Sequence, residues 1–311
     1  MTPPRLRLGT RASALARWQA NWVAQQLAQH GAQVELVLVT TRGDADPQER
    51  IADIGSPGAF TKELQRALLN GHIDLAVHSL KDLPTDPVEG LVLAAVPERA
   101  SVFDVLVSPH GNLAGLPAGA TVGTGSLRRR AQLLHARPDL QMCDVRGNVD
   151  TRLTKLAAGQ YNALVLAQAG LARLGLEDHI AQVLPPEVML PAVGQGALAV
   201  ETRADDSATR AAVAPLDDAA SHVAVVAERA LLAALEGGCL APIGAWARPQ
   251  SDGQLRLDAV VLSADGARRL AAHDSVAVGE PAAAIALGES VARRLLAAGA
   301  GEVLRQVRGG S

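Results

Sequence analysis

Short apolar segments alternate with helical stretches through most of this chain, and this alternation restricts its fold more than any other feature. Near-continuous apolar strands separated by helices predict β-sheets that are covered by helices on both faces. The strand-like segments are numerous enough for two such sheets. Strands are expected at Leu6–Gly9, Gln33–Thr40, Ile73–Ser79, Leu91–Val96, Thr121–Gly123, Gln141–Val145 and Ala163–Ala167. Helices are expected at about 14–29, 59–70, 127–136, 149–158 and 169–175.

The last third of the chain has a different pattern, which predicts a small α+β domain with an antiparallel sheet. Asp252-Gly253 and Asp265-Gly266 are turn signals between and after two strand-like segments. Because 311 residues exceed what one ordinary hydrophobic core holds, we expect two or three domains in all. The expected C-terminal elements are a helix over Ser221–Leu235, strands at about 243–248 and 255–263, and a closing helix at about 282–298.

Composition and charge argue against several classes of protein. The formal net charge is −3 and aromatic residues make up 2% of the chain, so it lacks the positive charge and the stacking surfaces of a nucleic-acid-binding protein. No apolar run reaches the roughly 18 residues that cross a bilayer, and Met1–Leu8 lacks the apolar core of a signal peptide. Cys143 and Cys239 form neither a disulfide framework nor a metal-ligand pattern. We therefore expect a cytoplasmic protein without nucleic-acid or membrane partners.

A polar segment, His78–Pro84, follows directly on the apolar strand Ile73–Val77. Polar groups at the carboxyl end of a parallel strand face the crevice in which open α/β sheets bind ligands. Asp82, next to Lys81, is therefore a candidate catalytic carboxylate. A solvated turn is the alternative, and this segment taken alone favours it.

Two strand-to-helix turns carry arginines. The first, Gly123–Arg130, leads into a helix that Ser126 can cap, and the free N–H groups of a helix start favour an anion. It lacks the third glycine of a dinucleotide fingerprint and the Lys-Ser/Thr end of a P-loop, which argues against a nucleotide. The second, Val145–Leu153, repeats the arrangement, and Arg11 lies at the start of the first helix. Because arginines hold carboxylates by charge-assisted hydrogen bonds, we expect one pocket for several carboxylates or phosphates; a plain solvated helix start remains the alternative for the first turn.

Cys239 follows Gly237-Gly238 in a loop directly after a helix. A flexible, accessible loop suits a nucleophilic thiol, although reactivity also needs a favourable local field. A small buried hydrophobe is the alternative, and the position of Cys239 alone favours it. Cys143, inside the strand Gln141–Val145, is expected to be such a buried residue, and the eight histidines show no metal-ligand pairing.

Several short motifs, taken together and in this order, resemble the porphobilinogen deaminase family across nearly the whole chain. A series of such motifs is specific, whereas one of them alone would be weak. They are Gly9–Ser13, Thr41–Asp44, His78–Pro84, Gly123–Arg129, Arg146–Asn148, Pro191–Gly196 and Glu236–Cys239.

The resemblance implies an α/β fold of three domains. Two doubly wound lobes would be similar to those of periplasmic binding proteins, with the active site between them, and a small α+β domain with an antiparallel sheet would follow. The chain would return to the first domain after Pro191. Domain 1 is expected at 1–98 and 196–216, the arginine-rich domain 2 at 99–195 and domain 3 at 217–311.

The activity that the resemblance implies is a transferase reaction of tetrapyrrole (haem and porphyrin) biosynthesis. Four porphobilinogen units would be joined head to tail onto a covalent dipyrromethane primer, with release of ammonia at each addition. Water would then release hydroxymethylbilane. Cys239 would carry the dipyrromethane cofactor through a thioether, and Asp82 matches the catalytic aspartate of the family. Porphobilinogen and linear pyrrole intermediates would be the partners of a monomer.

Each pyrrole bears an acetate and a propionate, which would explain why a chain of net charge −3 gathers arginines. No metal is expected. The resemblance assigns cofactor contacts to Ser79, Lys81, Thr124, Ser126, Arg128, Arg129, Asp44, Arg146 and Gly147. It assigns substrate contacts to Arg11, Ser13, Phe60, Arg146, Arg152, Arg173 and Gln195.

Three positions depart from the family's pattern. Asp53 and Pro57 stand where lysines are common, and Gly125 stands where serine is common. In the family, the segment before Phe60 would contact carboxylates of the pyrrole chain, and these changes put those contacts in doubt. The resulting hypothesis is that the pyrrole chain is elongated more slowly. Two other hypotheses stay open. A two-lobed solute-binding protein for a small anion is disfavoured by the missing signal sequence and by a third domain with a thiol. A deaminase-like paralogue without turnover is kept open by Asp53 and Pro57.

Overall fold

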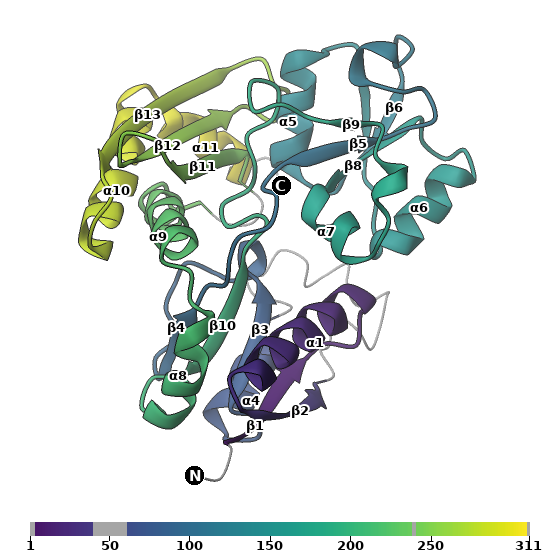
Figure 1. Ribbon diagram of the computed structural model, residues 1–311. Coiled ribbons are helices and arrows are strands. Elements are labelled where there is room, and N and C mark those ends of the chain that lie inside the picture. Colours follow the sequence, from purple (N-terminus) through teal and green to yellow (C-terminus); the bar gives the residue numbers. More distant parts are fainter. Residues whose placement is uncertain (1–3, 40–60, 238–240, 310–311) are drawn as a thin grey trace. The chain divides into compact units, whose positions relative to one another are not determined.

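The computed structural model describes residues 4–39, 61–237 and 241–309. These residues belong to two compact units (Figure 1). Unit 1 comprises Met1–Ala100 and Ala197–His222, and unit 2 comprises Ser101–Gly196 and Val223–Ser311. The chain thus leaves unit 1 after Ala100, returns to it at Ala197 and leaves it again after His222.

A five-stranded mixed sheet forms the centre of unit 1, with the strand order β2-β1-β3-β10-β4. β1 pairs in parallel with β2 and β3, whereas β10 pairs antiparallel with both β3 and β4. A late strand therefore lies between two early ones. The strands are β1 (Arg5–Thr10), β2 (Gln33–Leu38), β3 (Leu75–Ser79), β4 (Leu91–Ala95) and β10 (Leu198–Arg203). The helices of this unit are α1 (Ala14–Gln29), α4 (Lys62–Leu69) and α8 (Ser207–Val213).

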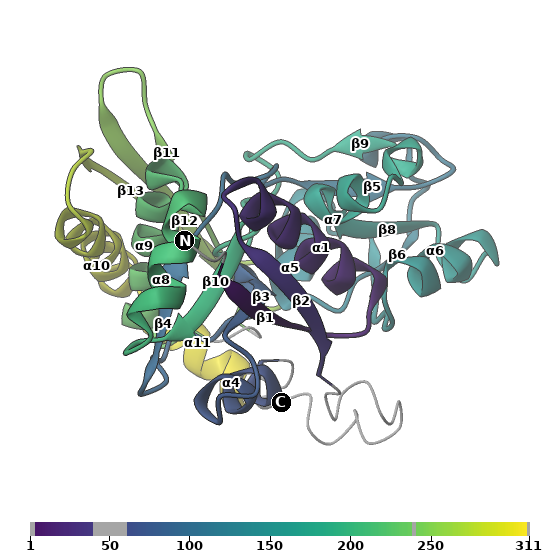
Figure 2. The same ribbon diagram turned by 60° about the horizontal axis from the view of Figure 1, so that its bottom comes forward.

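Helices cover both faces of this sheet because successive side chains of a strand point to opposite sides. Leu75 and Val77 of β3 pack in one cluster with Val23 and Leu27 of α1. Ala76, which lies between them, packs in a separate cluster with α4. Figure 2 shows α1 and α4 on opposite sides of the sheet. Each fully buried Leu or Val side chain contributes about 1.5–3 kcal/mol to folding.

The first sheet of unit 2 repeats this plan, with the strand order β7-β6-β8-β5-β9. β6 pairs in parallel with β7 and β8, and β5 is inserted antiparallel between β8 and β9. The strands are β5 (Asp104–Val107), β6 (Thr121–Gly123), β7 (Gln141–Cys143), β8 (Ala163–Ala167) and β9 (Gln182–Val183). The helices are α5 (Leu127–Ala136), α6 (Val149–Ala157) and α7 (Gln168–Arg173), of which α5 packs in one apolar cluster and α6 and α7 in another.

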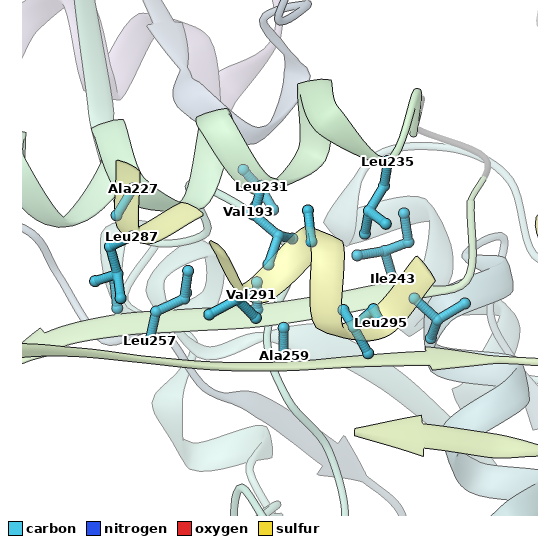
Figure 3. Packing of buried hydrophobic residues seen from close by; sticks show 14 of the residues in the cluster. Val193, Ala227, Leu231, Leu235, Ile243, Leu257, Ala259, Leu287, Val291 and Leu295 are labelled. Atoms are coloured by element: carbon cyan, nitrogen blue, oxygen red, sulfur yellow. The ribbon is translucent and has the colours of Figure 1, made fainter. Parts of the chain in front are cut away.

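A three-stranded antiparallel sheet, β11-β12-β13, makes up the rest of unit 2. Figure 3 shows its apolar core, in which Leu231 of α9 and Leu235, just after that helix, meet Val291 and Leu295 of α10 over Leu257 of β12. The elements are α9 (Ala219–Ala234), β11 (Ile243–Pro249), β12 (Gln254–Leu262), β13 (Arg269–Ala277), α10 (Pro281–Ala297) and α11 (Ala300–Gly309).

The opposite face of this small sheet packs against the first sheet's helix α5 within unit 2. Val260 and Leu262 of β12 form a buried cluster with Ala131 of α5 and with Leu190. Trp246 of β11 borders that cluster, and its ring lies 5.4 Å, edge to face, from the ring of Phe103. The two sheets of unit 2 are therefore joined by apolar packing and form one compact body.

The α/β fold class is confirmed, including the small antiparallel sheet at the C-terminal end. One expected boundary is wrong: the helix expected at about 282–298 does not close the chain, because α11 follows it after a turn at Gly299, whose φ is +99°. The strands β5, β9, β10 and β13 are not foreseen. The division into three domains stays a prediction, since the described residues form two compact units. None of the helices in the described ranges combines the length and the hydropathy that a membrane span needs.

The hairpin turn at Gly266 gives a first testable prediction. Gly266 has φ +74°, and a Cβ there would lie 2.5 Å from the carbonyl oxygen of Ala131 in α5. Gly253, in the preceding hairpin turn, has φ +77° with open space around it. We expect Gly266→Ala to lower the free energy of unfolding by about 2–4 kcal/mol, because a clash adds to the backbone strain, and Gly253→Ala by only about 1 kcal/mol. Chemical denaturation measures both, and equal losses would contradict the close packing.

Candidate active site

Asp82 ends a short 3₁₀ turn, Leu80–Asp82, that follows directly on the carboxyl end of β3. The turn is fixed from behind, because the buried Leu80 donates its backbone N–H to the carbonyl of Ala197 at 3.0 Å, just ahead of β10. Asp82 itself is exposed, while Lys81 is half-buried. The structure thus holds the backbone of this turn and leaves the carboxylate of Asp82 open to a reactant.

Buried polar groups support the end of β3. His78 Nε2 lies 3.1 Å from Oε2 of Glu201 on β10, and Gln65 donates to Oε1 of the same carboxylate at 3.0 Å. Ser79 accepts a hydrogen bond from the buried Gln19 of α1 at 2.8 Å. The supporting side chains Gln19, Gln65 and Glu201 were not foreseen, since they lie far from β3 in the sequence and no local spacing marks them.

Ser13 caps α1, as expected: its hydroxyl accepts a hydrogen bond from the N–H of Ala16 at 3.3 Å. Arg11, just ahead of this cap, is half-buried. The first turn of α1 therefore presents a capped helix start next to a guanidinium group.

The start of α5 is built in the same way. Ser126 caps the helix towards the N–H of Arg129, and the N–H of Ser126 in turn donates to the hydroxyl of the buried Thr124 at 3.2 Å. Gly125 is exposed, and a Cβ there would lie 3.2 Å from the carbonyl oxygen of Val145, so a side chain at this position would make a close contact with that backbone.

Arg128 and Arg129 point into the protein, where they share the carboxylate of Asp104. Arg128 Nη1 lies 2.7 Å from Oδ2 of Asp104, and Arg129 Nε and Nη2 lie 2.9 and 2.8 Å from Oδ1. The exposed fractions are 0% for Asp104, 4% for Arg128 and 7% for Arg129. Their guanidinium groups also donate to the carbonyls of Leu190 and Val165, at 2.6 and 3.0 Å.

The charges of this cluster perturb one another. Burial alone would raise the pKa of the Asp104 carboxyl, but the positive charges of Arg128 and Arg129 outweigh it and hold that pKa well below its usual range. Burial lowers the pKa of Arg128, against the opposing effect of Asp104. Within the described residues, Nε of Arg128 is buried without a hydrogen-bond partner.

The second arginine-bearing turn lies ahead of α6. Asn148 caps this helix towards Thr151, and Arg152 Nε donates to the carbonyl of Gly147 at 2.9 Å. Burial and the positive charge of Arg129 both lower the pKa of Arg152. Arg146 is exposed. Arg152 is therefore a partly buried guanidinium group that also feels the positive charge of Arg129.

Two further candidates, Arg173 and Gln195, belong to the region where the chain leaves unit 2 at Gly196. Arg173 donates to the carbonyl of Gly196 at 2.7 Å, and burial lowers its pKa to about 10. Gln195 is buried and donates to Asp104 at 3.0 Å and to the carbonyl of Val102 at 2.8 Å. The structure therefore brings Gln195 together with Arg128 and Arg129, through a carboxylate that the sequence analysis missed.

Several expected residues lie outside the described ranges: Asp44, Asp53, Pro57, Phe60 and Cys239. Cys143 is half-buried in β7, which is more exposed than expected. In the part of the chain that the structure describes, no three His, Cys, Asp or Glu side chains come together as a metal site.

Comparison with known proteins assigns the chain to a class and then to a family. A family model described as "Porphobilinogen deaminase, dipyromethane cofactor binding domain" matches residues 6–211, and its "C-terminal domain" counterpart matches residues 222–297. The matches define a transferase enzyme. More particularly, the chain belongs to the porphobilinogen deaminase family.

Named relatives agree over almost the full length. The chain is 51% identical over 307 residues to the porphobilinogen deaminase of Desulforudis audaxviator (strain MP104C), covering 98% of both chains. It is 50% identical over 306 residues to that of Moorella thermoacetica (strain ATCC 39073 / JCM 9320), covering 97% of this chain and 96% of the relative. Among solved structures, the methionine-binding protein MetQ matches 68% of this chain and 89% of its own with 16% identity and a TM-score of 0.45, which says nothing about a ligand here.

The opposite pKa shifts of two arginines give a second prediction. The pKa of Arg152 is lowered, so its charge opposes folding, whereas a hydrogen bond to Asp139 raises the pKa of the half-buried Arg137. In a Cys239→Ala background, in which the resemblance to the family predicts that no primer is held covalently, we expect Arg152→Met to raise the free energy of unfolding by about 1 kcal/mol and Arg137→Met to lower it. Urea denaturation near neutral pH checks the two signs; a loss of stability in both variants would contradict an excess of positive charge at Arg152.

Proposed function

We propose that this protein joins four porphobilinogen units head to tail onto a dipyrromethane primer, which Cys239 holds through a thioether, and then releases hydroxymethylbilane. The observation that carries this proposal is the cluster of Arg128, Arg129 and Arg152. Its three positive charges are offset by one buried carboxylate, that of Asp104. Such a cluster in a chain of net charge −3 calls for an anionic ligand. Pyrroles bearing acetate and propionate meet that requirement, and the family assignment supports them.

The residues of unit 2 fit the carboxylates of the primer and of the growing chain. Arginine binds carboxylates with paired, charge-assisted hydrogen bonds, and a capped helix start adds backbone N–H groups. The lowered pKa of Arg152, caused by burial and by the positive charge of Arg129, favours a nearby anion. When bound, the primer supplies the pyrrole carbon to which the first substrate unit is joined. We assign its carboxylates to the starts of α5 and α6, namely Thr124, Ser126, Arg128, Arg129, Arg146 and Gly147.

Asp82 is the proposed catalytic residue. Porphobilinogen loses ammonia when its aminomethyl C–N bond breaks, which leaves an electron-poor azafulvene. A carboxylate near the pyrrole N–H stabilises the developing positive charge. In its protonated form the Asp82 carboxyl group can pass its proton to the leaving amine. The carboxylate that results can then accept the proton that the attacked pyrrole carbon loses once the new C–C bond has formed. An exposed carboxylate on a fixed turn suits this role. Lys81 lies on the same turn, and Ser79 directly precedes it.

The remaining contacts are proposed from the family pattern. Arg11, Ser13, Arg152, Arg173 and Gln195 would hold substrate carboxylates, together with Phe60 against a pyrrole ring and Asp44 at the cofactor. The protein would act in the cytoplasm as a monomer, with porphobilinogen and linear pyrrole intermediates as its only partners. The net charge of −3 supports the absence of a nucleic-acid partner.

Intact-protein mass spectrometry tests the proposed anchor. We expect the chain, produced in cells that supply porphobilinogen, to carry an adduct of two pyrrole units. Cys239→Ala should lose the adduct, because no thiol remains to form the thioether. Cys143→Ala removes the other cysteine and should keep the adduct in full. An unmodified wild-type chain, or an adduct that follows Cys143, would overturn the assignment.

Steady-state turnover of porphobilinogen tests the role of Asp82. We expect Asp82→Ala to retain the fold and to lose about 10²–10⁴-fold in kcat, the range typical of general acid–base catalysis. Asp86→Ala, which removes a neighbouring exposed carboxylate, should stay within about twofold of wild type. Substantial turnover by Asp82→Ala would refute the role given to that carboxylate.

A further inference from the structure

Asp104 is the most deeply buried charged group near the proposed anion site, and no role has been assigned to it so far. It is the first residue of β5, which is inserted antiparallel between β8 and β9. Its exposed fraction is 0%, so its carboxylate cannot touch a reactant. Any effect of Asp104 on the reaction must therefore pass through the side chains that it holds.

Three side chains from two distant segments converge on this carboxylate. Oδ2 accepts from Arg128 Nη1 at 2.7 Å, and Oδ1 accepts from Arg129 Nε at 2.9 Å and from Gln195 Nε2 at 3.0 Å. Because a guanidinium is planar and its N–H groups point in fixed directions, bonds to both carboxylate oxygens set the orientation of both arginines.

The same carboxylate sets the charge of the site. Two buried guanidinium groups without an anion would be strongly unfavourable, and one carboxylate compensates only one of them. The remaining positive charge also acts on Arg152, whose pKa is lowered by burial and, in addition, by Arg129. The Arg128 Nε that has no partner in the described residues belongs to this same group.

We propose that Asp104 is a positioning residue, which fixes the guanidinium groups of Arg128 and Arg129 in the orientation that binds the carboxylates of the pyrrole chain. The inference rests on the proposed function, since it takes the pyrrole carboxylates as the ligand. Such fixed donors need not reorganise when the anion arrives, and this is what makes a site of this kind effective. Binding and turnover should therefore depend on the exact placement of the Asp104 oxygens as well as on their charge.

Two substitutions of Asp104 separate charge from placement. Asp104→Asn keeps the shape and removes the charge, while Asp104→Glu keeps the charge and moves the oxygens by one methylene group. Asp139→Asn is the matched control, because Asp139 pairs with Arg137 at the exposed far end of α5, 2.7 Å from its Nε. Kinetics are measured on folded enzyme that carries the two-pyrrole adduct, so that a loss of folded protein does not count as a loss of activity.

We expect kcat/KM for porphobilinogen to fall at least 100-fold in Asp104→Asn and at least tenfold in Asp104→Glu, with Asp139→Asn within twofold of wild type. If Asp104→Asn does not fold, Asp104→Glu decides. An Asp104→Glu enzyme with the kcat/KM of wild type, or an Asp104→Asn enzyme that is only less stable, would overturn the proposal.

A second measurement does not depend on turnover. In the Cys239→Ala background, citrate serves as a tricarboxylate probe, and the midpoint of thermal unfolding is followed with increasing citrate. The midpoint should rise for the parent chain and for Asp139→Asn, and the rise should be lost in Asp104→Asn and reduced in Asp104→Glu. A parent chain that citrate does not stabilise, or an unchanged rise in both Asp104 variants, would overturn the positioning role. Absence of adduct and turnover in wild type would defeat only the proposed function.

Discussion

The buried contact of Asp104 with Arg128 and Arg129 is the interaction on which unit 2 depends most. It ties the first residue of β5 to the first turn of α5, and through the carbonyls of Val165 and Leu190 it also reaches β8 and the segment that leads out of the unit. Removing one partner from such a buried group typically costs about 3–5 kcal/mol, because the other charge is left without compensation. Because two guanidinium groups share one carboxylate, one positive charge remains uncompensated. The contact therefore matters both for the structure of unit 2 and for the proposed binding of an anion.

Much of the fold follows from local patterns in the sequence. The expected helix at 14–29 coincides with α1, and the caps at Ser13 and Ser126 form as their residue types predict. The strand-to-helix turns with their arginines also lie where the pattern places them. These features are local: each depends on residues within a few positions of one another, so a single sequence contains the information.

The parts that were missed depend on partners far apart in the chain. Asp104 binds Gln195 across 91 positions, and His78 meets Glu201 across 123 positions. β5 begins with a charged residue, and Glu201 interrupts the apolar run of β10, so both strands lack a clear strand signal. Arg128 and Arg129 show the same limit, because their residue types predict an anion ligand while only the structure reveals a carboxylate of the protein already bound to them. Phe60 and Cys239 lie outside the described residues, so their roles rest on the family pattern.

The late position of β10 has a consequence for how the chain matures as it is synthesised. The first hundred residues supply four strands of the sheet in unit 1, but the place between β3 and β4 is filled only by Leu198–Arg203. Until that strand has left the ribosome, β3 and β4 have no shared neighbour, and His78 lacks its carboxylate partner. The first sheet of unit 2, which ends with β9 at Val183, is complete in sequence before that point. The N-terminal unit is therefore begun first and completed last, and its open strand edges are the part of the nascent chain most exposed to wrong pairing.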